Sequence, residues 1–218
     1  IETSGLYDIT LGSLIIDEGF GPSASMSDES IKVSSKRFVF ISDNSIIKND
    51  NFQFDLSSIA KGFAVDSVSR ILLAAGKNNF LIDIGGEIII NGSKHNQPWA
   101  IGIQDPTSVN NSSIINIFGD DFLAVATSGE YRNFKYNDDG EMTSHTFNPI
   151  SKTSIPDKTY SVSVVSRVSS MQADALATAL NVMGPVKGIK FANEKDLSVM
   201  YIMQGKNLIK SNKWNYND

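Results

Sequence analysis

Apolar residues recur every three or four positions in two segments of the chain, which predicts two main amphipathic helices. The first segment, residues 57–76, starts with serines that can cap a helix and ends at Gly76, which can stop it. Its predicted buried face consists of Ala60, Ala64, Val68, Ile71, Leu72 and Ala75. The second helix is predicted from about Ser170 to Met183, ending at Gly184-Pro185, and a short third helix from about Pro185 to Asn193. The apolar stripe of the second helix consists of Ala175, Leu176, Ala179 and Leu180.

Short runs rich in β-branched and aromatic residues predict strands around these helices. The runs are residues 37–43, 79–84, 87–91, 99–104, 112–118, 123–127, 160–166 and 197–203. Gly85-Gly86 predicts a turn between paired strands, and Asn137-Asp138-Asp139-Gly140 predicts a hairpin turn between residues 131–136 and 141–145. Antiparallel hairpins with two long helices against them make an α+β fold. Because no fixed-period repeat or low-complexity linker interrupts the chain, residues 1–218 are predicted to form a single domain.

Composition and charge exclude several classes of function. With 41% hydrophobic and 20% charged residues, the chain has an ordinary globular composition. No apolar run approaches the roughly 18 residues that a membrane-spanning helix needs. The net charge of −5 and the absence of a basic stripe argue against binding of nucleic acid. The chain has no cysteine and two histidines, so a bound metal must use oxygen ligands or histidine.

The strongest local sign of a metal site lies in the second predicted helix. Asp174 and Thr178 are one helical turn apart, so a carboxylate and a hydroxyl face the same side. The residues next to them are alanines, which allow another backbone to come close and add carbonyl oxygens. Such an oxygen-only set suits Mg²⁺ better than Zn²⁺. The alternative interpretation is that Asp174 caps or solvates an alanine-rich core helix.

Three further segments could bind a ligand, although each also has a simpler structural explanation. Asp83-Ile84-Gly85-Gly86-Glu87 exposes bare backbone to a flat or phosphate-bearing ligand, or is a plain hairpin. The segment Thr127 to Asn133 concentrates hydroxyls, an arginine and an amide, as an anion-binding loop or a polar turn does. Ser144-His145-Thr146 offers a histidine for proton transfer or phosphate contact, although a lone histidine is often structural. His95 lies in a polar loop and is predicted to be a surface residue.

Taken together and in order, these segments resemble the FAD:protein FMN transferase (ApbE) family. The resemblance covers nearly the whole chain. Its blocks are Tyr7 to Gly12, Gly19 to Pro22, Asp55 to Asp66, Asp83 to Glu87, Pro98 to Ile103, Ala124 to Asn133, Ser144 to Thr146 and Ala173 to Leu180. Several ordered blocks are far more specific than any one of them.

The resemblance implies a fold and a reaction. The fold would be ApbE-like (T-fold-like), with antiparallel sheets packed against two main helices. The reaction would cleave the pyrophosphate of FAD and join FMN through a phosphoester to a Thr or Ser hydroxyl of a redox flavoprotein, with AMP leaving and Mg²⁺ assisting. Two alternatives remain: an FAD pyrophosphatase that gives FMN and AMP, and a flavin-binding module without turnover.

The resemblance also implies roles for individual residues. Mg²⁺ would be held by the carbonyl of Ala60, the carboxylate of Asp174 and the hydroxyl of Thr178. His145, as the base, and Thr146 would lie at the pyrophosphate. The residues expected to contact the cofactor are Lys61, Asp66, Gly85, Gly86, Glu87, Ser128 and Gly129.

The sequence departs from the family pattern at three places. Members carry a segment before the Tyr7 block that helps to hold the flavin, so we expect this domain to be N-terminally incomplete, with room for a lipid anchor upstream. Asn148 replaces the usual acid after the histidine block, and Glu18 replaces a common tryptophan.

The family resemblance implies an extracytoplasmic location, periplasmic or on the outer face of the membrane.

Overall fold

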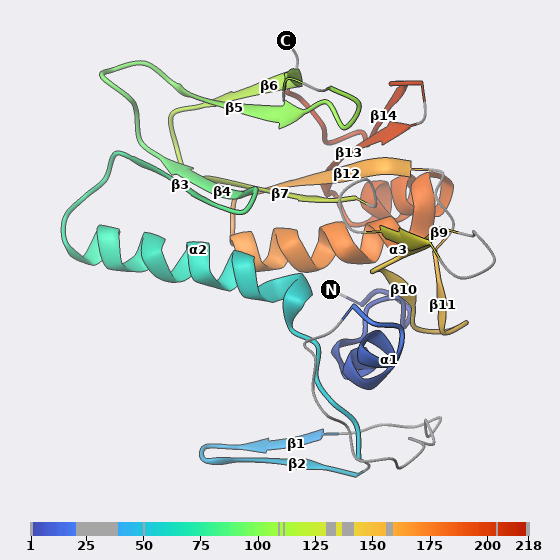
Figure 1. Cartoon of the computed structure of the whole chain (residues 1–218). Coiled ribbons are helices and arrows are strands. Elements are labelled where there is room, and N and C mark those ends of the chain that lie inside the picture. The colour runs from blue at the N-terminus through green and yellow to red at the C-terminus, as the bar shows by residue number, and fades with distance from the viewer. Residues whose placement is uncertain are drawn as a thin grey trace.

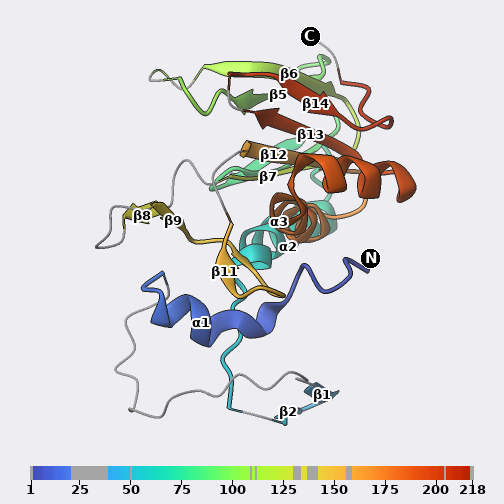
Figure 2. The ribbon, with the colours of Figure 1, turned by 90° about the vertical axis from the view of Figure 1, so that its right-hand side faces the viewer.

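The molecule is built in layers around an antiparallel sheet (Figures 1 and 2). A computed structural model describes residues 2–20, 39–49, 51–108, 110, 112–129, 134–136, 142–155, 159–203 and 205–216. In both views, a hairpin of two strands, β5 and β6, covers one face of the sheet, and the helices α2 and α3 cover the other. This arrangement, antiparallel sheets packed with two main helices, is the α+β fold predicted from the sequence.

Six strands form the central sheet, in the order β14-β13-β12-β7-β4-β3, and every neighbouring pair is antiparallel. The strands are β3 (Phe80–Ile84), β4 (Glu87–Asn91), β7 (Leu123–Ser128), β12 (Thr159–Ser166), β13 (Ser198–Met203) and β14 (Leu208–Lys210). The central strands are apolar on both faces because both faces are covered. Except for β14, these strands were predicted from the sequence.

Strands β5 (Trp99–Gln104) and β6 (Ser113–Gly119) pair only with each other among the described strands. Their inward side chains pack on the sheet in one apolar cluster that contains Ile101, Ile103, Ile115, Ile117, Ile90, Leu123, Val125, Met200 and Ile202. Burying a side chain of this size contributes about 1.5–3 kcal/mol to folding. The hairpin is therefore held on the sheet mainly by hydrophobic packing, and β5 also contributes to the wall of the pocket described below.

Helix α2 (Ser57–Ala74) begins and ends where the sequence predicts. Asp55 accepts hydrogen bonds from the backbone N–H and the hydroxyl of Ser57, and Gly76 has a positive φ of 72° just after the helix. The predicted buried face was mostly wrong, however, although Leu72 does pack against a core cluster. The helix buries the side that carries Gly62, Val65 and Ser69, whereas Ile71 is 67% exposed. Apolar residues lie on all sides of this helix, so its periodicity alone could not select the face.

Helix α3 (Ser170–Glu194) contains the second and third predicted helices. The hydroxyl of Ser169 caps its start by accepting a hydrogen bond from the N–H of Gln172. Gly184 has non-helical angles and is followed by Pro185, so α3 is kinked at the predicted break. Leu176, Ala179 and Leu180 are buried, which confirms most of the predicted apolar stripe.

The remaining elements are short. They are η1 (Ile9–Leu11), α1 (Gly12–Asp17), β1 (Val39–Ser42), β2 (Ser45–Lys48), β8 (Phe134–Tyr136), β9 (Met142–Ser144), β10 (Phe147–Asn148) and β11 (Thr153–Ser154). Strands β8 and β9 pair as predicted, while the Asn137–Gly140 turn between them lies outside the described residues. The sequence patterns missed α1, β2, β10 and β11. Among the described residues, no helix is both long enough and apolar enough to cross a membrane.

Candidate functional site

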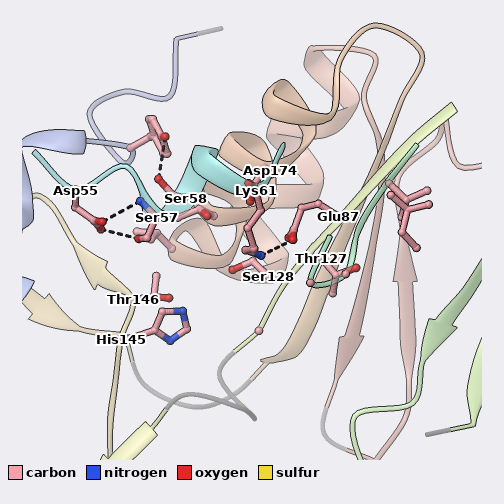
Figure 3. A pocket seen from close by; sticks show the side chains of 18 of the residues that line it. Asp55, Ser57, Ser58, Lys61, Glu87, Thr127, Ser128, His145, Thr146 and Asp174 are labelled. Carbon is pink, nitrogen blue, oxygen red and sulfur yellow. Dashed lines mark hydrogen bonds and ion pairs between the residues drawn. The ribbon is translucent and has the colours of Figure 1, made fainter. Parts of the chain in front are cut away.

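A pocket of about 940 Å³ lies where the N-terminal end of α2 and the part of α3 around Asp174 and Thr178 meet the β3–β4 turn and the end of β7. Its wall takes residues from the α1 region, α2, the β3–β4 turn, β5, β7, the loop around His145 and α3. Figure 3 shows the polar side chains that converge on it. The sequence-predicted residues that line it are Lys61, Gly85, Gly86, Glu87, Ser128, Gly129, His145, Thr146, Asp174 and Thr178. The fold thus brings together most of the predicted site.

Lys61 of α2 and Glu87 of β4 form an ion pair in this wall, with 2.5 Å between Lys61 Nζ and Glu87 Oε2. Glu87 is only 1% exposed, while the Lys61 side chain remains 44% exposed. Burial raises the pKa of the Glu87 carboxyl, and the nearby Lys61 lowers it in part. The buried carboxylate therefore anchors one side of the lysine and leaves the rest of the ammonium group open to the pocket.

The turn between β3 and β4 brings bare backbone to the same place. Gly85 and Gly86 have positive φ values of 64° and 98°, as a two-residue hairpin turn requires. The Gly86 N–H donates to Asp83 Oδ1 at 3.0 Å. A Cβ added at Gly85 would lie 3.3 Å from Cδ of Lys61. Glycine here allows the turn to fold and lets a ligand lie against the main chain beside the lysine.

Asp174 lies at the crossing of the two helices. Its Oδ2 accepts a hydrogen bond from the Gly62 N–H at 3.0 Å, and no second partner is found for the carboxylate among the described residues. It is 5% exposed, and burial raises its pKa to about 6, with the Gly62 bond opposing this and the Glu87 charge adding to it. Thr178, one turn further along α3, lines the same pocket. A buried carboxylate next to a second carboxylate favours a bound cation.

No group of three or more histidine, aspartate or glutamate side chains that could hold a metal occurs among the described residues. A metal at this crossing would therefore need oxygens from Asp174, Thr178 and the backbone. That donor set suits Mg²⁺, which takes few carboxylates and keeps other oxygen ligands such as water and phosphate.

His145 and Thr146 face the helices from the opposite side of the pocket (Figure 3). Their loop is held by Ser144 and Ser154: the Ser144 N–H donates to Ser154 Oγ at 2.8 Å, and the two hydroxyls are 3.0 Å apart. The Ser144 hydroxyl also donates to the carbonyl of Thr146 at 3.2 Å. On the β7 side, Ser128 Oγ accepts a hydrogen bond from the buried Asn181 Nδ2 at 3.3 Å.

Two of the predicted residues do not line the pocket. Asp66 lies further along α2, where its carboxylate accepts three hydrogen bonds from the start of α3, so its predicted contact with the nucleotide is not supported. Ala60 is exposed on another side of α2, although Ser58, two residues earlier, is part of the pocket wall. The wall of the pocket therefore includes Ser58 of this helix and not Ala60.

The family model described as the ApbE family matches residues 1–202. The chain belongs to the ApbE family. An ApbE relative named FAD:protein FMN transferase from Vibrio cholerae is 36% identical over 212 residues, covering 93% of this chain and 63% of the relative. One of the same name from Klebsiella pneumoniae is 31% identical, covering 93% of this chain and 61% of the relative. The chain thus spans somewhat less than two thirds of the length of these curated ApbE relatives.

Solved ApbE structures share the fold. The ApbE protein of Thermotoga maritima superposes with a TM-score of 0.83 at 26% identity, covering 99% of this chain and 73% of that one. The flavin transferase ApbE of Vibrio cholerae gives a TM-score of 0.77 at 33% identity, covering 97% and 71%. These likenesses confirm the family and the fold inferred from the ordered sequence blocks.

The ApbE pocket contains further polar residues to which the sequence assigned no role. The Tyr7 hydroxyl lies 2.9 Å from Ser58 Oγ, and burial raises the pKa of this tyrosine. Asp55 lies at the start of α2 and points into the pocket beside Ser57 (Figure 3). All of these residues belong to the sequence blocks of the resemblance. The signal was present, but periodicity does not show which members of a block face the pocket.

Proposed function

We propose that this protein transfers FMN from FAD to a Thr or Ser hydroxyl of an acceptor redox flavoprotein and releases AMP. The observation that carries the proposal is that one pocket gathers a lysine, a glycine turn, a histidine and a buried carboxylate. This set suits a phosphate-bearing ligand, and it occurs in a member of the ApbE family whose relatives are named FAD:protein FMN transferase.

The reaction needs a nucleophile from the acceptor and charge stabilisation from the protein. The acceptor oxygen forms a new bond to the phosphorus on the riboflavin side of the pyrophosphate. The bond between this phosphorus and the bridging oxygen breaks, and AMP leaves with that oxygen. An imidazole nitrogen of His145 takes the hydroxyl proton, and Lys61 offsets negative charge on the phosphates. Thr146, next to His145, is positioned to contact the same phosphates.

Mg²⁺ is part of this proposal because the oxygen donors at the helix crossing fit it. Bound there, it would neutralise charge on the pyrophosphate and the leaving AMP. Asp174 and Thr178 would supply two ligands. For the backbone ligand we replace Ala60 by Ser58. Ser58 lines the pocket and precedes by four residues Gly62, whose N–H bonds Asp174, so helical geometry places the Ser58 carbonyl beside that carboxylate.

The test is a flavinylation assay. The 218-residue chain is mixed with FAD, MgCl₂ and a threonine-bearing acceptor domain, and the acceptor is examined by mass spectrometry and by flavin fluorescence in a denaturing gel. We expect an acceptor heavier by one FMN phosphoester and an equal amount of AMP, with neither formed in EDTA. Matched acceptors with the threonine replaced by valine should stay unmodified.

Two other results would replace the proposal. Equal formation of free FMN and AMP with and without the acceptor identifies an FAD pyrophosphatase, in which water takes the place of the hydroxyl. FAD that binds and stays intact in the presence of Mg²⁺ identifies a flavin-binding module.

We also propose, on the family resemblance alone, that the acceptor lies outside the cytoplasm, in the periplasm or on the outer face of the membrane. Fractionation of cells that produce the native protein tests this. Recovery of the protein only with cytoplasmic markers would contradict it.

A further inference from the structure

Asp66 links helices α2 and α3, which form the side of the pocket that carries Asp174 and Thr178. Its carboxylate, near the middle of α2, accepts hydrogen bonds from three groups at the start of α3: Ser169 Oγ at 2.7 Å, Ser170 N at 2.8 Å and Met171 N at 3.0 Å. The first N–H groups of a helix have no partner within that helix. Asp66 therefore caps α3 from a position more than 100 residues earlier in the chain.

The charge and the hydrogen bonds act in the same direction. A carboxylate at the start of a helix interacts favourably with the helix dipole, and hydrogen bonds to an ionised acceptor are stronger than neutral ones. Ser169 Oγ donates to Asp66 and also accepts from the N–H of Gln172, so the cap of α3 and its attachment to α2 share one hydroxyl. The start of α3 is thereby fixed in both position and direction relative to α2.

One helical turn before Asp66, the backbones of the two helices come into direct contact at Gly62. A Cβ at this position would lie 2.6 Å from both Cα of Met171 and the carbonyl oxygen of Ser170. From the same residue, the N–H bonds Asp174 Oδ2. The two helices therefore run antiparallel here. Asp66 of α2 lies beside the first turn of α3, and Gly62, one turn earlier in α2, lies beside Asp174, one turn later in α3.

We propose that Asp66 is a positioning residue for the metal site: by holding the first turn of α3 on α2, it places the Asp174 carboxylate against Gly62 and toward the pocket. This inference rests on the proposed function, because it assumes that Asp174 binds a metal. It assigns Asp66 no contact with the nucleotide.

The inference predicts that Asp66 acts on metal affinity in the folded protein. In the 218-residue chain without FAD, Mn²⁺ binding is followed by EPR and Mg²⁺ binding by calorimetry, well below the Tm of each variant. We expect Asp66→Asn to bind either ion about 10- to 100-fold more weakly, as loss of groups that orient metal ligands commonly does. Its Tm should also fall by about 2–8 °C, because one helix cap is weakened.

A second variant keeps the test decisive if Asp66→Asn folds poorly. Ser169→Ala removes one of the three contacts and leaves the carboxylate in place, so we expect a smaller loss of metal affinity in the same direction. The matched control is Asp196→Asn, which makes the same chemical change at an exposed aspartate paired with Lys213. It should bind Mn²⁺ as the wild type does.

The possible outcomes separate this inference from the proposed function. Wild-type metal affinity in Asp66→Asn or Ser169→Ala, whatever their Tm, would show that the contact only stabilises the fold and would overturn the inference. A wild-type protein that binds neither ion would overturn the metal site itself, and the inference with it. Restored FMN transfer by Asp66→Asn at high Mg²⁺, with an unchanged maximal rate, would support it.

Discussion

The two sides of the pocket are built in different ways. On one side, Asp174 and Thr178 project from the long helix α3, whose position on α2 is set by backbone contact at Gly62 and by three hydrogen bonds to Asp66. On the other side, His145 and Thr146 lie among strands of two or three residues, held by the Ser144–Ser154 hydrogen bonds. Packing across the core positions the first side, and a few local contacts position the second.

This difference separates two kinds of sensitivity. Changes on the helical side should alter metal affinity and stability together, because the same contacts serve both. Changes on the His145 side should alter the rate with little effect on the rest of the fold.

The largest effect is expected for His145→Ala, which removes the proposed base. The rate of FMN transfer should fall by about 10²–10⁴-fold, the usual contribution of general acid–base catalysis. FAD affinity and Tm should change little. His95→Ala is the matched control, because His95 is the other histidine and lies exposed in a loop. Equal rates for His145→Ala and this control would remove His145 from the mechanism.

Asp174→Asn should follow, with a loss of about 10²-fold or more in rate, because a preorganised charge at the pyrophosphate is removed. The variant should no longer respond to Mg²⁺ in a titration of initial rates, while its circular dichroism spectrum stays that of the wild type. Asp121→Asn, at an exposed aspartate, provides the control. An unchanged Mg²⁺ titration for Asp174→Asn would refute the ligand assignment.

A smaller effect is expected for Ser154→Ala, which removes the hydroxyl that accepts from the Ser144 N–H. The loop that carries His145 should then be less well placed, and kcat should fall by about 10-fold without a change in Mn²⁺ affinity. Ser151→Ala, in the exposed turn of the same loop, should keep the wild-type kcat. A fall in metal affinity for Ser154→Ala would mean that the two sides are not independent.

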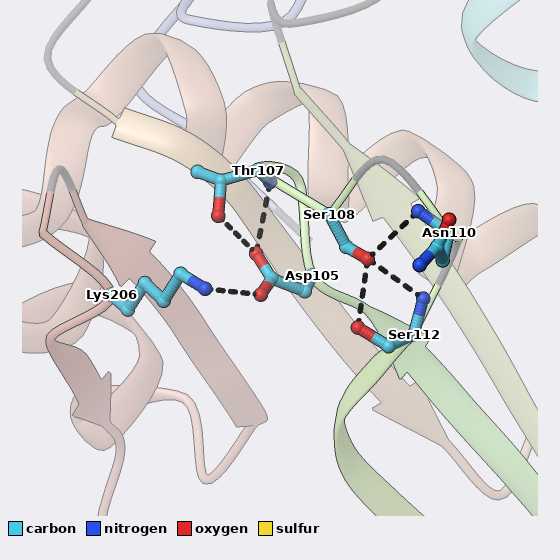
Figure 4. Close-up of polar contacts among 6 residues, drawn as sticks. All are labelled: Asp105, Thr107, Ser108, Asn110, Ser112 and Lys206. Carbon is cyan, nitrogen blue, oxygen red and sulfur yellow. Dashed lines mark hydrogen bonds and ion pairs between the residues drawn. The ribbon is translucent and has the colours of Figure 1, made fainter.

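The smallest effect is expected on stability at acid pH, and it concerns the β5–β6 hairpin, whose strand β5 also lines the pocket. Beyond β5, Asp105 accepts hydrogen bonds from Thr107 and from Lys206 Nζ, the latter at 2.6 Å (Figure 4). The Lys206 bond, followed by those of Thr107, lowers the pKa of Asp105 to about 2. The pKa of Asp105 is therefore lower in the folded than in the unfolded protein, so the ionised carboxylate stabilises the fold. This stabilisation is present above the unfolded pKa and is lost as the pH falls from about 4 to about 2.

With Asp105→Asn, the free energy of unfolding should therefore fall less steeply as the pH drops from about 4 to about 2, and its dependence on pH near neutrality should not change. Urea unfolding at several pH values measures it. Lys206→Gln should make the same fall less steep, and a double variant whose fall is no less steep than that of either single one would show that the pair acts as a unit. A fall as steep as that of the wild type in both single variants would contradict the assignment.

The sequence predicted the parts of the molecule that depend on local pattern. The two helices, the kink at Gly184 and the Gly85-Gly86 turn follow from periodicity and from the special conformations of glycine and proline. The short strands β10 and β11 could not be predicted, because two residues carry no periodicity. Most of the site residues were predicted from the ordered sequence blocks of the family resemblance, and most of them line the pocket.

The two predicted residues that lie outside the pocket wall, Ala60 and Asp66, are both on α2, whose apolar residues surround the helix and hide its buried side. Only the packing of α3 decides that Gly62 faces inward, that Ser58 lies in the pocket wall and that Asp66 reaches the start of α3. A block of residues shared with a family shows that a site is present, but the helix partner determines which residues of that block face the ligand.

Gly62 has a consequence for anyone who engineers this protein for heat resistance. Replacing glycine by alanine inside a helix is a common stabilising change, worth up to about 1 kcal/mol from helix propensity alone. At position 62 the added methyl group would meet backbone atoms of Ser170 and Met171, which cannot rotate aside as a side chain can. The helices would have to move apart, and Asp174 would move with them. The substitution that a propensity scale recommends most strongly in α2 would thus disturb the packing that positions Asp174.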